Sequence, residues 1–370
     1  MLLRHLFATL LLAVGLPVHA GANGTEAGQP GFLSSTDCFQ ATPDYESWLQ
    51  SIPDTINGME IPREALAKAV PARAFAFARS GFDCRIVTYA SDGQIVSGYV
   101  VQPKPDAAGG KHPLLVYNRG GNGDFGRIDS LQLFRKLLPL AKAGYVVVAS
   151  QYRDDDEFGG KDVDDVMRLI DLSLSLPGVD AEHVYMMGES RGAMTSYLVA
   201  RQRHDITAMA TIGGCTNLLV ELAWRPEMER VYRARIPGYD GHEHAALEAR
   251  SALRWAEQLP AGMPVLLMHG ELDERVNVEN SRAMAARLEA LGRPHKLVVY
   301  AGDDHGVRQH RRDAMIEMLA WFKGAPAANQ RSLPEPRAAT PTPTSGSRVV
   351  PARRRAFPRS LQRATRAARG

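Results

Sequence analysis

The chain alternates short apolar runs with segments in which apolar residues recur at helical spacing. Across 162–174, for example, apolar side chains follow the i, i+3, i+4, i+7 pattern of an amphipathic helix. Buried strands are predicted at 113–117, 145–150, 184–187, 206–212, 264–268 and 296–300. Strands that alternate with helices predict an α/β fold with a doubly wound, mostly parallel sheet.

Two segments depart from this alternation. The β-rich runs 85–89 and 94–101 are joined through Asp92-Gly93, which predicts an antiparallel hairpin at one edge of the sheet. The stretch 216–259 holds charged residues and four aromatic ones but no strand signal. It is expected to form a helical cap over the active site, whose aromatic side chains line an apolar pocket: Trp224, Tyr232, Tyr239 and Trp255.

The pattern divides the chain into four parts. Residues 1–20 are predicted to be a signal peptide, with Arg4 before a short apolar run and a small-x-small cleavage site at 18–20. An N-terminal extension over 21–83 is expected to pack on a catalytic domain at 84–324. A basic tail over 325–370, predicted to be disordered, has no apolar period.

The signal peptide predicts a secreted or periplasmic protein. Of the three cysteines, Cys38 and Cys84 are the expected disulfide pair in such a compartment, and Cys215 is expected to stay a free, buried thiol. No other segment is long and apolar enough to predict a membrane-spanning helix. The oligomeric state does not follow from the sequence.

Charge separates the tail from the body. The net charge is +3, but the tail alone holds ten Arg and one Glu, whereas 21–324 is mildly acidic. No nucleic-acid partner is expected. The tail either contacts an anionic surface or is a non-functional extension.

The run at 184–187 ends in Gly-Glu-Ser-Arg-Gly at 188–192, and a helix-forming segment follows. Strand, G-x-S-x-G and helix together are typical of a nucleophile elbow, with a structural glycine turn as the alternative. Gly188 and Gly192 carry no Cβ that would collide with the neighbouring backbone. Ser190 is therefore the candidate nucleophile, at the N-terminus of a helix.

A serine nucleophile needs a base, and the base needs an orienting acid. In folds with this elbow the acid follows a later strand, here 264–268. Asp273 is the expected acid, and Glu271, closer to the strand, is its rival. His269, at the end of that strand, is expected to be structural.

The base is expected after the last strand, 296–300. His305 follows it and is the candidate, whereas Asp303 and Asp304 are expected to shape its turn. The loops after parallel strands meet at the carboxyl edge of a sheet, so His305 and Asp273 are predicted to lie near Ser190.

The oxyanion needs at least two hydrogen-bond donors. The backbone N–H of Arg191, directly after the nucleophile, is one candidate. The loop Arg119-Gly120-Gly121 after the strand 113–117 is expected to supply the others. Its alternative interpretation is a simple turn.

Together these residues resemble the catalytic domain of the prolyl oligopeptidase family of serine hydrolases, over about 85–323. The resemblance implies an α/β-hydrolase fold with Ser190, Asp273 and His305 as the catalytic triad. It rests on the hairpin with Gly98-Tyr99 and Pro103, Tyr117 with Gly120-Gly121, the 188–192 motif, His269-Gly270 with Asp273 and Val276, and Asp304-His305-Gly306.

Two departures from the family pattern shape the expected function. Members commonly carry His or Tyr where this chain has Arg119, which could face the oxyanion, a substrate carboxylate or a structural salt bridge. Only about 60 residues precede the hydrolase core after the predicted signal, so the propeller of oligopeptidases, and with it proline-specific peptidase activity, is not expected. Compact relatives of this kind are often esterases.

The sequence therefore predicts a secreted serine hydrolase that cleaves a carboxylic ester or small peptide or amide bond through an acyl-serine, preferring small esters to prolyl peptides. The alternatives are a serine peptidase of prolyl oligopeptidase type and a non-catalytic binding protein on a hydrolase scaffold. No cofactor or metal is expected, because the isolated pair His242 and His244 lies in a polar segment.

Overall fold

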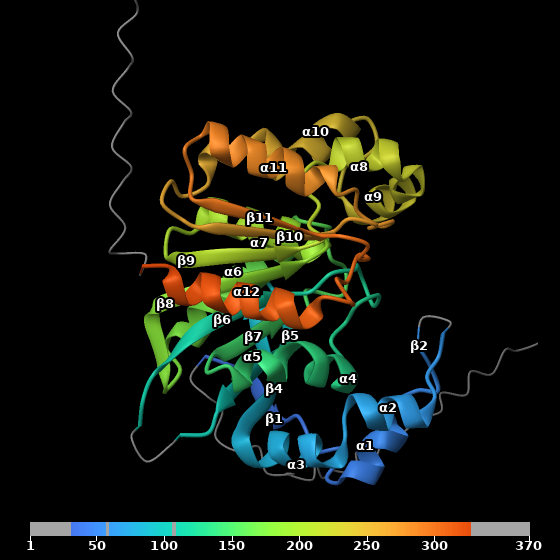
Figure 1. The fold of residues 1–370 in the computed structure, drawn as a ribbon, viewed down its shortest axis with the longest axis vertical. Helices are drawn as coiled ribbons and strands as arrows, with labels where there is room; N and C mark the ends of the chain where they lie inside the picture. The colour runs from blue at the N-terminus through green and yellow to red at the C-terminus, as the bar shows by residue number, and fades with distance from the viewer. Residues whose placement is uncertain (1–30, 57–58, 106–108, 327–370) are drawn as a thin grey trace, which may run out of the picture. The chain divides into compact units, whose positions relative to one another are not determined.

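The computed structural model describes residues 31–56, 59–105 and 109–326. The predicted signal peptide and all but the first two residues of the predicted tail lie outside these ranges. The described part is built on a nine-stranded sheet in the order β1-β4-β5-β7-β6-β8-β9-β10-β11, with helices on both faces (Figure 1). The predicted α/β class is confirmed.

Six neighbouring strands, from β7 to β11, are parallel, and β1, β4 and β5 add antiparallel pairs on one side. The strands are β1 (Ser34–Asp37), β4 (Phe82–Ser91), β5 (Gln94–Pro103), β6 (His112–Asn118), β7 (Val146–Ser150), β8 (Val179–Glu189), β9 (Ile206–Ile212), β10 (Val265–Gly270) and β11 (His295–Tyr300).

The predicted hairpin forms between β4 and β5, and Asp92 and Gly93 in its turn have φ of 45° and 75°. Such positive φ values at both central residues match the twist of two paired strands. The hairpin is not the edge of the sheet, however, because β1 pairs with β4 outside it. The short strand β1 carries no alternation that would have predicted it.

Alternate side chains of each strand pack into two different cores. In β6, Leu114 and Val116 face the core under α6 (Asp162–Leu174), α7 (Arg191–Gln202) and α11 (Glu279–Ala290). On the other face the sheet is covered by α4 (Ser130–Gln132), the π-helix η1 (Leu133–Leu137), α5 (Leu138–Lys142) and α12 (Arg311–Gly324). The two-residue period of a strand explains why one sheet serves both cores.

The N-terminal segment extends the second core. It contains α1 (Tyr45–Ser51), α2 (Arg63–Ala69), α3 (Ala72–Gly81) and the small hairpin of β2 (Thr55–Ile56) and β3 (Met59–Glu60). A disulfide joins Cys38 to Cys84 on β4, as expected, and Cys215 is free and buried. Figure 1 shows α1 and α3 next to the sheet end that carries β1 and β4.

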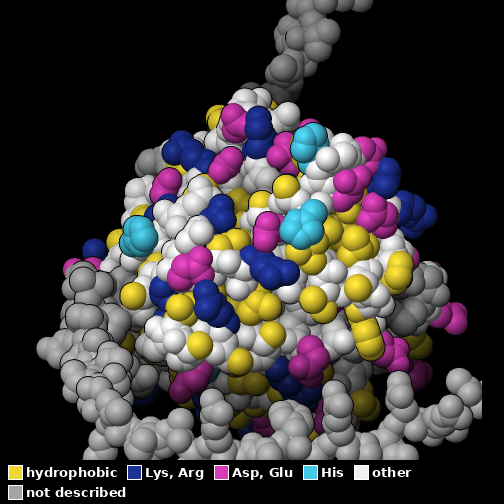
Figure 2. Space-filling view, turned by 90° about the horizontal axis from the view of Figure 1, so that it is seen from above, with side chains coloured by type: hydrophobic (Ala, Val, Ile, Leu, Met, Phe, Trp, Pro, Cys, Tyr) yellow, Lys and Arg dark blue, Asp and Glu magenta, His cyan; other side chains and the backbone are white. Residues whose placement is uncertain are grey.

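The predicted cap segment is helical. It contains α8 (Leu218–Trp224), η2 (Pro226–Met228), α9 (Glu229–Arg235), α10 (Glu243–Ala249), η3 (Ala252–Arg254) and η4 (Ala256–Gln258). Figure 2 views the molecule from above, over the end at which the cap helices lie in Figure 1. Basic and acidic side chains are interspersed on this surface. Within the described ranges no helix combines the length and apolar character needed to cross a bilayer.

Candidate active site

Ser190 stands at a sharp turn between β8 and α7. Its backbone has φ 56° and ψ −125°, a strained conformation for a residue with a side chain, and its N–H donates to the Ile212 carbonyl at 2.9 Å. A Cβ at Gly188 would lie 2.4 Å from the carbonyl oxygen of Gly192, and one at Gly192 would lie 2.0 Å from that of Asn118. Backbone packing therefore requires both glycines of the motif.

The loops after β10 and β11 bring the expected acid and base together. His305 Nδ1 lies 2.7 Å from Asp273 Oδ2, and Asp273 Oδ1 accepts the backbone N–H groups of Arg275 and Val276 at 2.8 and 2.9 Å. His305 and Ser190 line the same cavity. The structure thus gathers the three residues at the carboxyl edge of the sheet.

His269 supports the acid. Its Nε2 lies 3.0 Å from Asp273 Oδ2 and 3.0 Å from the Val276 carbonyl, which accepts only, so this nitrogen carries a proton. Its Nδ1 lies 2.7 Å from Ser281 Oγ. Burial would raise the pKa of Asp273, but hydrogen bonds from His269 and His305 outweigh it and hold the pKa well below its usual value. Asp273 is therefore an ionised, fixed partner for His305.

The other candidate carboxylates accept hydrogen bonds from backbone N–H groups in nearby turns. Glu271 is exposed and accepts the Gly302 N–H at 3.1 Å. Asp303 is buried and accepts backbone N–H groups from Asp304, Gln309 and His310. Among the described residues, neither carboxylate forms a hydrogen bond with a ring nitrogen of His305.

The expected oxyanion donors flank Ser190. Arg191 is the first residue of α7, so its N–H has no intrahelical acceptor. A Cβ at Gly120 would lie 3.1 Å from Ser190 Cβ, and Gly121, with φ 75°, would place one 2.0 Å from the Phe125 carbonyl oxygen. Gly120 therefore packs tightly against the nucleophile, and Gly121 holds a turn of the loop that has no room for a side chain.

The Arg119 side chain corrects an expectation. Its side chain is only 2% exposed, and its guanidinium lies 4.7 Å from the centre of the Tyr152 ring. Its Nε and Nη atoms donate to the main-chain carbonyls of Gly120, Gly123, Phe125 and Gln151. Because those carbonyls occupy the donors, the guanidinium faces neither an oxyanion nor a substrate carboxylate, and it forms no salt bridge among the described residues. Its role is to hold the loop.

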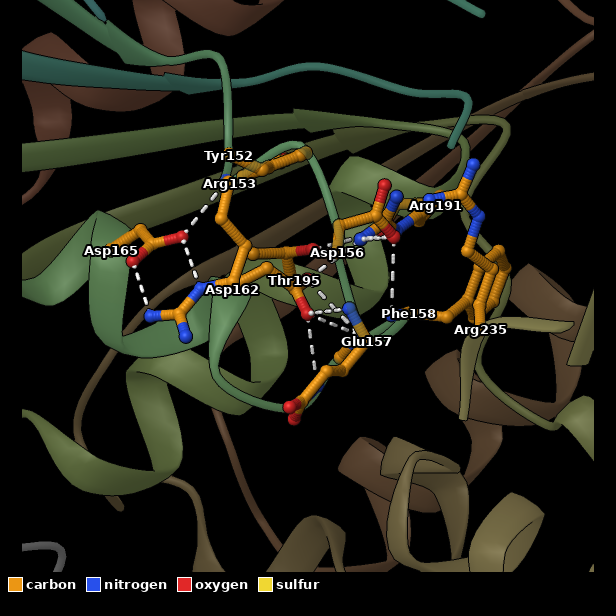
Figure 3. A network of polar contacts seen from close by, with 12 residues as sticks. Tyr152, Arg153, Asp156, Glu157, Phe158, Asp162, Asp165, Arg191, Thr195 and Arg235 are labelled. Carbon is orange, nitrogen blue, oxygen red and sulfur yellow. Dashed lines mark hydrogen bonds and ion pairs between the residues drawn. The ribbon is translucent and has the colours of Figure 1, made fainter. Parts of the chain in front are cut away.

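The Arg191 side chain adds a contact that the sequence did not predict. Its guanidinium pairs with Asp156 at 2.9 Å and Asp162 at 2.7 Å (Figure 3). It also donates to the Gly121 carbonyl at 2.9 Å. Burial would lower the pKa of Arg191, but the two carboxylates outweigh it and raise the pKa. Arg191 therefore places its backbone N–H beside Ser190 and, through its side chain, binds the loop that contains Gly121.

A cavity of about 430 Å³ extends from Ser190 and His305 beneath the cap. Of the four cap aromatics expected there, only Tyr232 lines it, so that prediction is wrong for the others. Trp224 is 51% exposed, Tyr239 turns away to bond Glu229, and Trp255 is buried with its N–H on the Ala249 carbonyl. The other lining residues are Gly121, Asn122, Phe125, Phe158, Arg191, Met194, Cys215, Glu221, Arg225, Met228, Val231, Arg275 and Val276.

The chain is similar to known peptidases. The chain is 25% identical over 247 residues to the uncharacterized peptidase YtmA of Bacillus subtilis, an alignment that covers 64% of this chain and 92% of the relative. It is 27% identical over 231 residues to dipeptidyl peptidase 8 of Homo sapiens, covering 57% of this chain but 25% of that protein. The chain thus spans most of one relative and a quarter of the other.

Solved structures show the same fold. An acylaminoacyl peptidase of Pyrococcus horikoshii matches with a TM-score of 0.58 at 21% identity, over 68% of this chain and 43% of that one. Residues 132–327, more than half of the sequence, match the model of the prolyl oligopeptidase family. That span contains Ser190, Asp273 and His305, and the chain belongs to the prolyl oligopeptidase family.

Proposed function

We propose that the protein is a serine peptidase that hydrolyses peptide or amide bonds through an acyl intermediate on Ser190. The observation that carries this proposal is the buried Asp273 carboxylate 2.7 Å from His305 Nδ1, beside a cavity that His305 shares with a strained Ser190. Asp273 fixes the tautomer of His305, leaving Nε2 free to act as base. Relatives named as peptidases support the same chemistry.

The first half-reaction forms the acyl-enzyme. Ser190 Oγ attacks the substrate carbonyl carbon while His305 Nε2 takes the hydroxyl proton. The carbonyl oxygen becomes negative and is stabilised by the N–H of Arg191 and by the amides of Gly120 and Gly121. When the C–N bond breaks, His305 returns the proton to the leaving amine. Water then repeats the sequence and releases the acid.

Ester cleavage is part of the proposal. An ester forms the same acyl-serine and has a better leaving group than an amide, so the site that hydrolyses one is suited to the other. A non-catalytic binding protein has no need of a strained serine beside a hydrogen-bonded Asp273 and His305.

Secretion also belongs to the proposal. It rests on the signal-peptide pattern at 1–20 and on the disulfide between Cys38 and Cys84, since disulfides persist in oxidising compartments. Expression of the full chain and N-terminal sequencing of the extracytoplasmic product would test it. Cleavage after residue 20 or 22 is expected. A protein that stays inside the cell with residues 1–20 still attached would refute the proposed secretion.

A fluorophosphonate probe tests the catalytic proposal directly. The wild-type protein is expected to be labelled at Ser190, and Ser190→Ala is expected to take no label. A panel of p-nitrophenyl esters beside aminoacyl and prolyl anilides then ranks the substrates, with small esters expected to exceed prolyl anilides at least tenfold in kcat/KM. Wild-type protein that resists the probe and cleaves no member of the panel would refute the proposal.

A further inference from the structure

Glu221, on α8 of the cap, lines the cavity that begins at Ser190. Its side chain is buried, with 3% of the residue exposed. One carboxylate oxygen, Oε2, accepts from Asn280 Nδ2 at 3.1 Å, whereas the buried Oε1 has no hydrogen-bond partner. A buried carboxylate oxygen without a hydrogen-bond partner is costly, and a ligand that supplies a donor would account for it.

No cation among the described residues pairs with this carboxylate. Arg225, which directly follows α8, directs its guanidinium to Glu227 at 2.8 Å and to the Arg275 carbonyl at 2.9 Å. Arg275 itself is exposed and lies 5.9 Å from the Phe125 ring centre. Burial raises the pKa of Glu221 and outweighs the charge of the partly exposed Arg225, which lowers that pKa, so a bound cation would favour the ionised carboxylate.

Much of the cavity wall is apolar, although Arg225 and Arg275 also line the cavity. The side chains that line it beside Ser190 and Glu221 include Phe158, Met194, Met228, Val231 and Val276. The apolar part of this wall suits a flexible methylene chain that ends in a cation, because the chain packs on it while the cation meets the Glu221 carboxylate.

We propose that Glu221 selects a lysine or arginine side chain at the substrate residue whose carbonyl Ser190 attacks. The inference rests on the proposed function, since it assigns the cavity to the acyl group of the intermediate. That group stays bonded to Ser190 through the second half-reaction, so the cavity beneath the cap is suited to it. The leaving group departs at the end of the first half-reaction.

The test compares ligands that differ only in the terminal cation. The rate at which the fluorophosphonate probe labels Ser190 is measured in the presence of a competitor. The competitor is the amide of lysine or of norleucine, acetylated on the α-amino group only. Hydrolysis of glycyl-lysine and glycyl-norleucine p-nitroanilides, with free and with acetylated N-termini, is measured in parallel. In the wild-type protein the lysine compounds are expected to protect, and to be hydrolysed, at least tenfold better than the norleucine ones.

Two variants isolate the carboxylate. Glu221→Gln is expected to reduce the lysine preference, in protection and in hydrolysis, below about threefold, with the norleucine compound measured on the same variant as the reference. Glu248→Gln, half-exposed on α10 and outside the cavity lining, removes one cap charge and is expected to retain the preference.

The outcomes separate the two proposals. Wild-type protein that reacts with the probe but is protected equally by both amides, or by neither, overturns the role of Glu221 and leaves the serine mechanism standing. A lysine preference that survives Glu221→Gln also overturns it. Wild-type protein that neither reacts with the probe nor cleaves any substrate overturns the proposed function itself.

Discussion

At the scale of single residues, the catalytic side chains act together, so the effects of removing them one by one are not additive. Ser190→Ala and His305→Ala are each expected to lower kcat by a factor of about 10⁴ to 10⁶, because His305 activates the Ser190 hydroxyl and the acyl-enzyme does not form without both. The double variant is expected to lose little more than either single one. Steady-state kinetics on the best substrate of the panel measures this, with far-UV circular dichroism to show that the fold is kept.

A Ser190→Ala protein that retained more than a few per cent of wild-type activity would contradict the assignment of the nucleophile. Additive losses in the double variant would argue that His305 acts on a different step.

Arg119 is a residue whose role changed when its contacts became known. Arg119→Ala is expected to lower the free energy of unfolding by about 3 kcal/mol or more, because it leaves several buried main-chain carbonyl oxygens without a donor. Urea unfolding followed by fluorescence measures the change. Arg127→Ala, which removes only exposed ion pairs, is the control and is expected to cost under about 1 kcal/mol.

The folded fraction of Arg119→Ala is expected to keep the wild-type KM for acidic and neutral substrates alike. A rise in KM confined to acidic substrates, with unchanged stability, would instead place the guanidinium on the substrate.

At the scale of elements, hydrophobic periodicity carried most of the prediction. The bounds of α6 and β9 match the predicted ranges 162–174 and 206–212, and the loops after β8, β10 and β11 bring Ser190, Asp273 and His305 to one edge. Chain order and the rule that the carboxyl ends of parallel strands share an edge were enough for this.

What could not be predicted depends on contacts distant in the sequence. Glu221 stands in a short helix with charged and apolar neighbours, and its burial follows from Asn280 on α11, 59 positions away. Asp156 is the last of three consecutive aspartates and the only buried one of the three. Its burial goes with its contact to Arg191, which lies on another element. Local pattern carries no information on such pairs.

The turn between β11 and α12, which carries His305, is held by Asp303. Burial would raise the pKa of this carboxylate, but hydrogen bonds from His310 and from backbone N–H groups outweigh it and lower the pKa to about 2. The unfolded-state pKa of Asp is about 3.9. The folded value is the lower one, so Asp303 stabilises the fold above the unfolded pKa, and this contribution is lost as the pH falls towards 2.

Asp303→Asn is therefore expected to cost about 2 kcal/mol at pH 6 and progressively less below pH 4. Urea unfolding at a series of pH values measures the difference from wild type. Asp313→Asn, an exposed carboxylate in the first turn of α12, is the control and is expected to show a small, nearly constant difference. A difference for Asp303→Asn that does not shrink in acid would show that its charge is not the cause.

At the scale of the whole described structure, one sheet separates two cores that meet different needs. The core under α6 and α7 supports the elbow and the cavity, whereas the core on the other face is shared between α12 and the N-terminal helices. Trp48 of α1 links these parts, because its ring lies 5.9 Å from Phe75 and 5.1 Å from Phe134 on η1. The N-terminal segment is thus part of the hydrolase core.

This sharing predicts that the N-terminal segment and the sheet unfold together. Trp48 is fully buried, so Trp48→Ala is expected to lower the free energy of unfolding by about 3–5 kcal/mol. Near-UV circular dichroism and loss of hydrolysis should still follow one transition on heating, at a lower Tm. Trp224→Ala provides the matched control, because that ring is 51% exposed on the cap and its removal is expected to cost under about 1 kcal/mol. Two separate transitions in the Trp48 variant, with hydrolysis retained after the first, would show instead that the segment is an independent unit resting on a self-sufficient catalytic core.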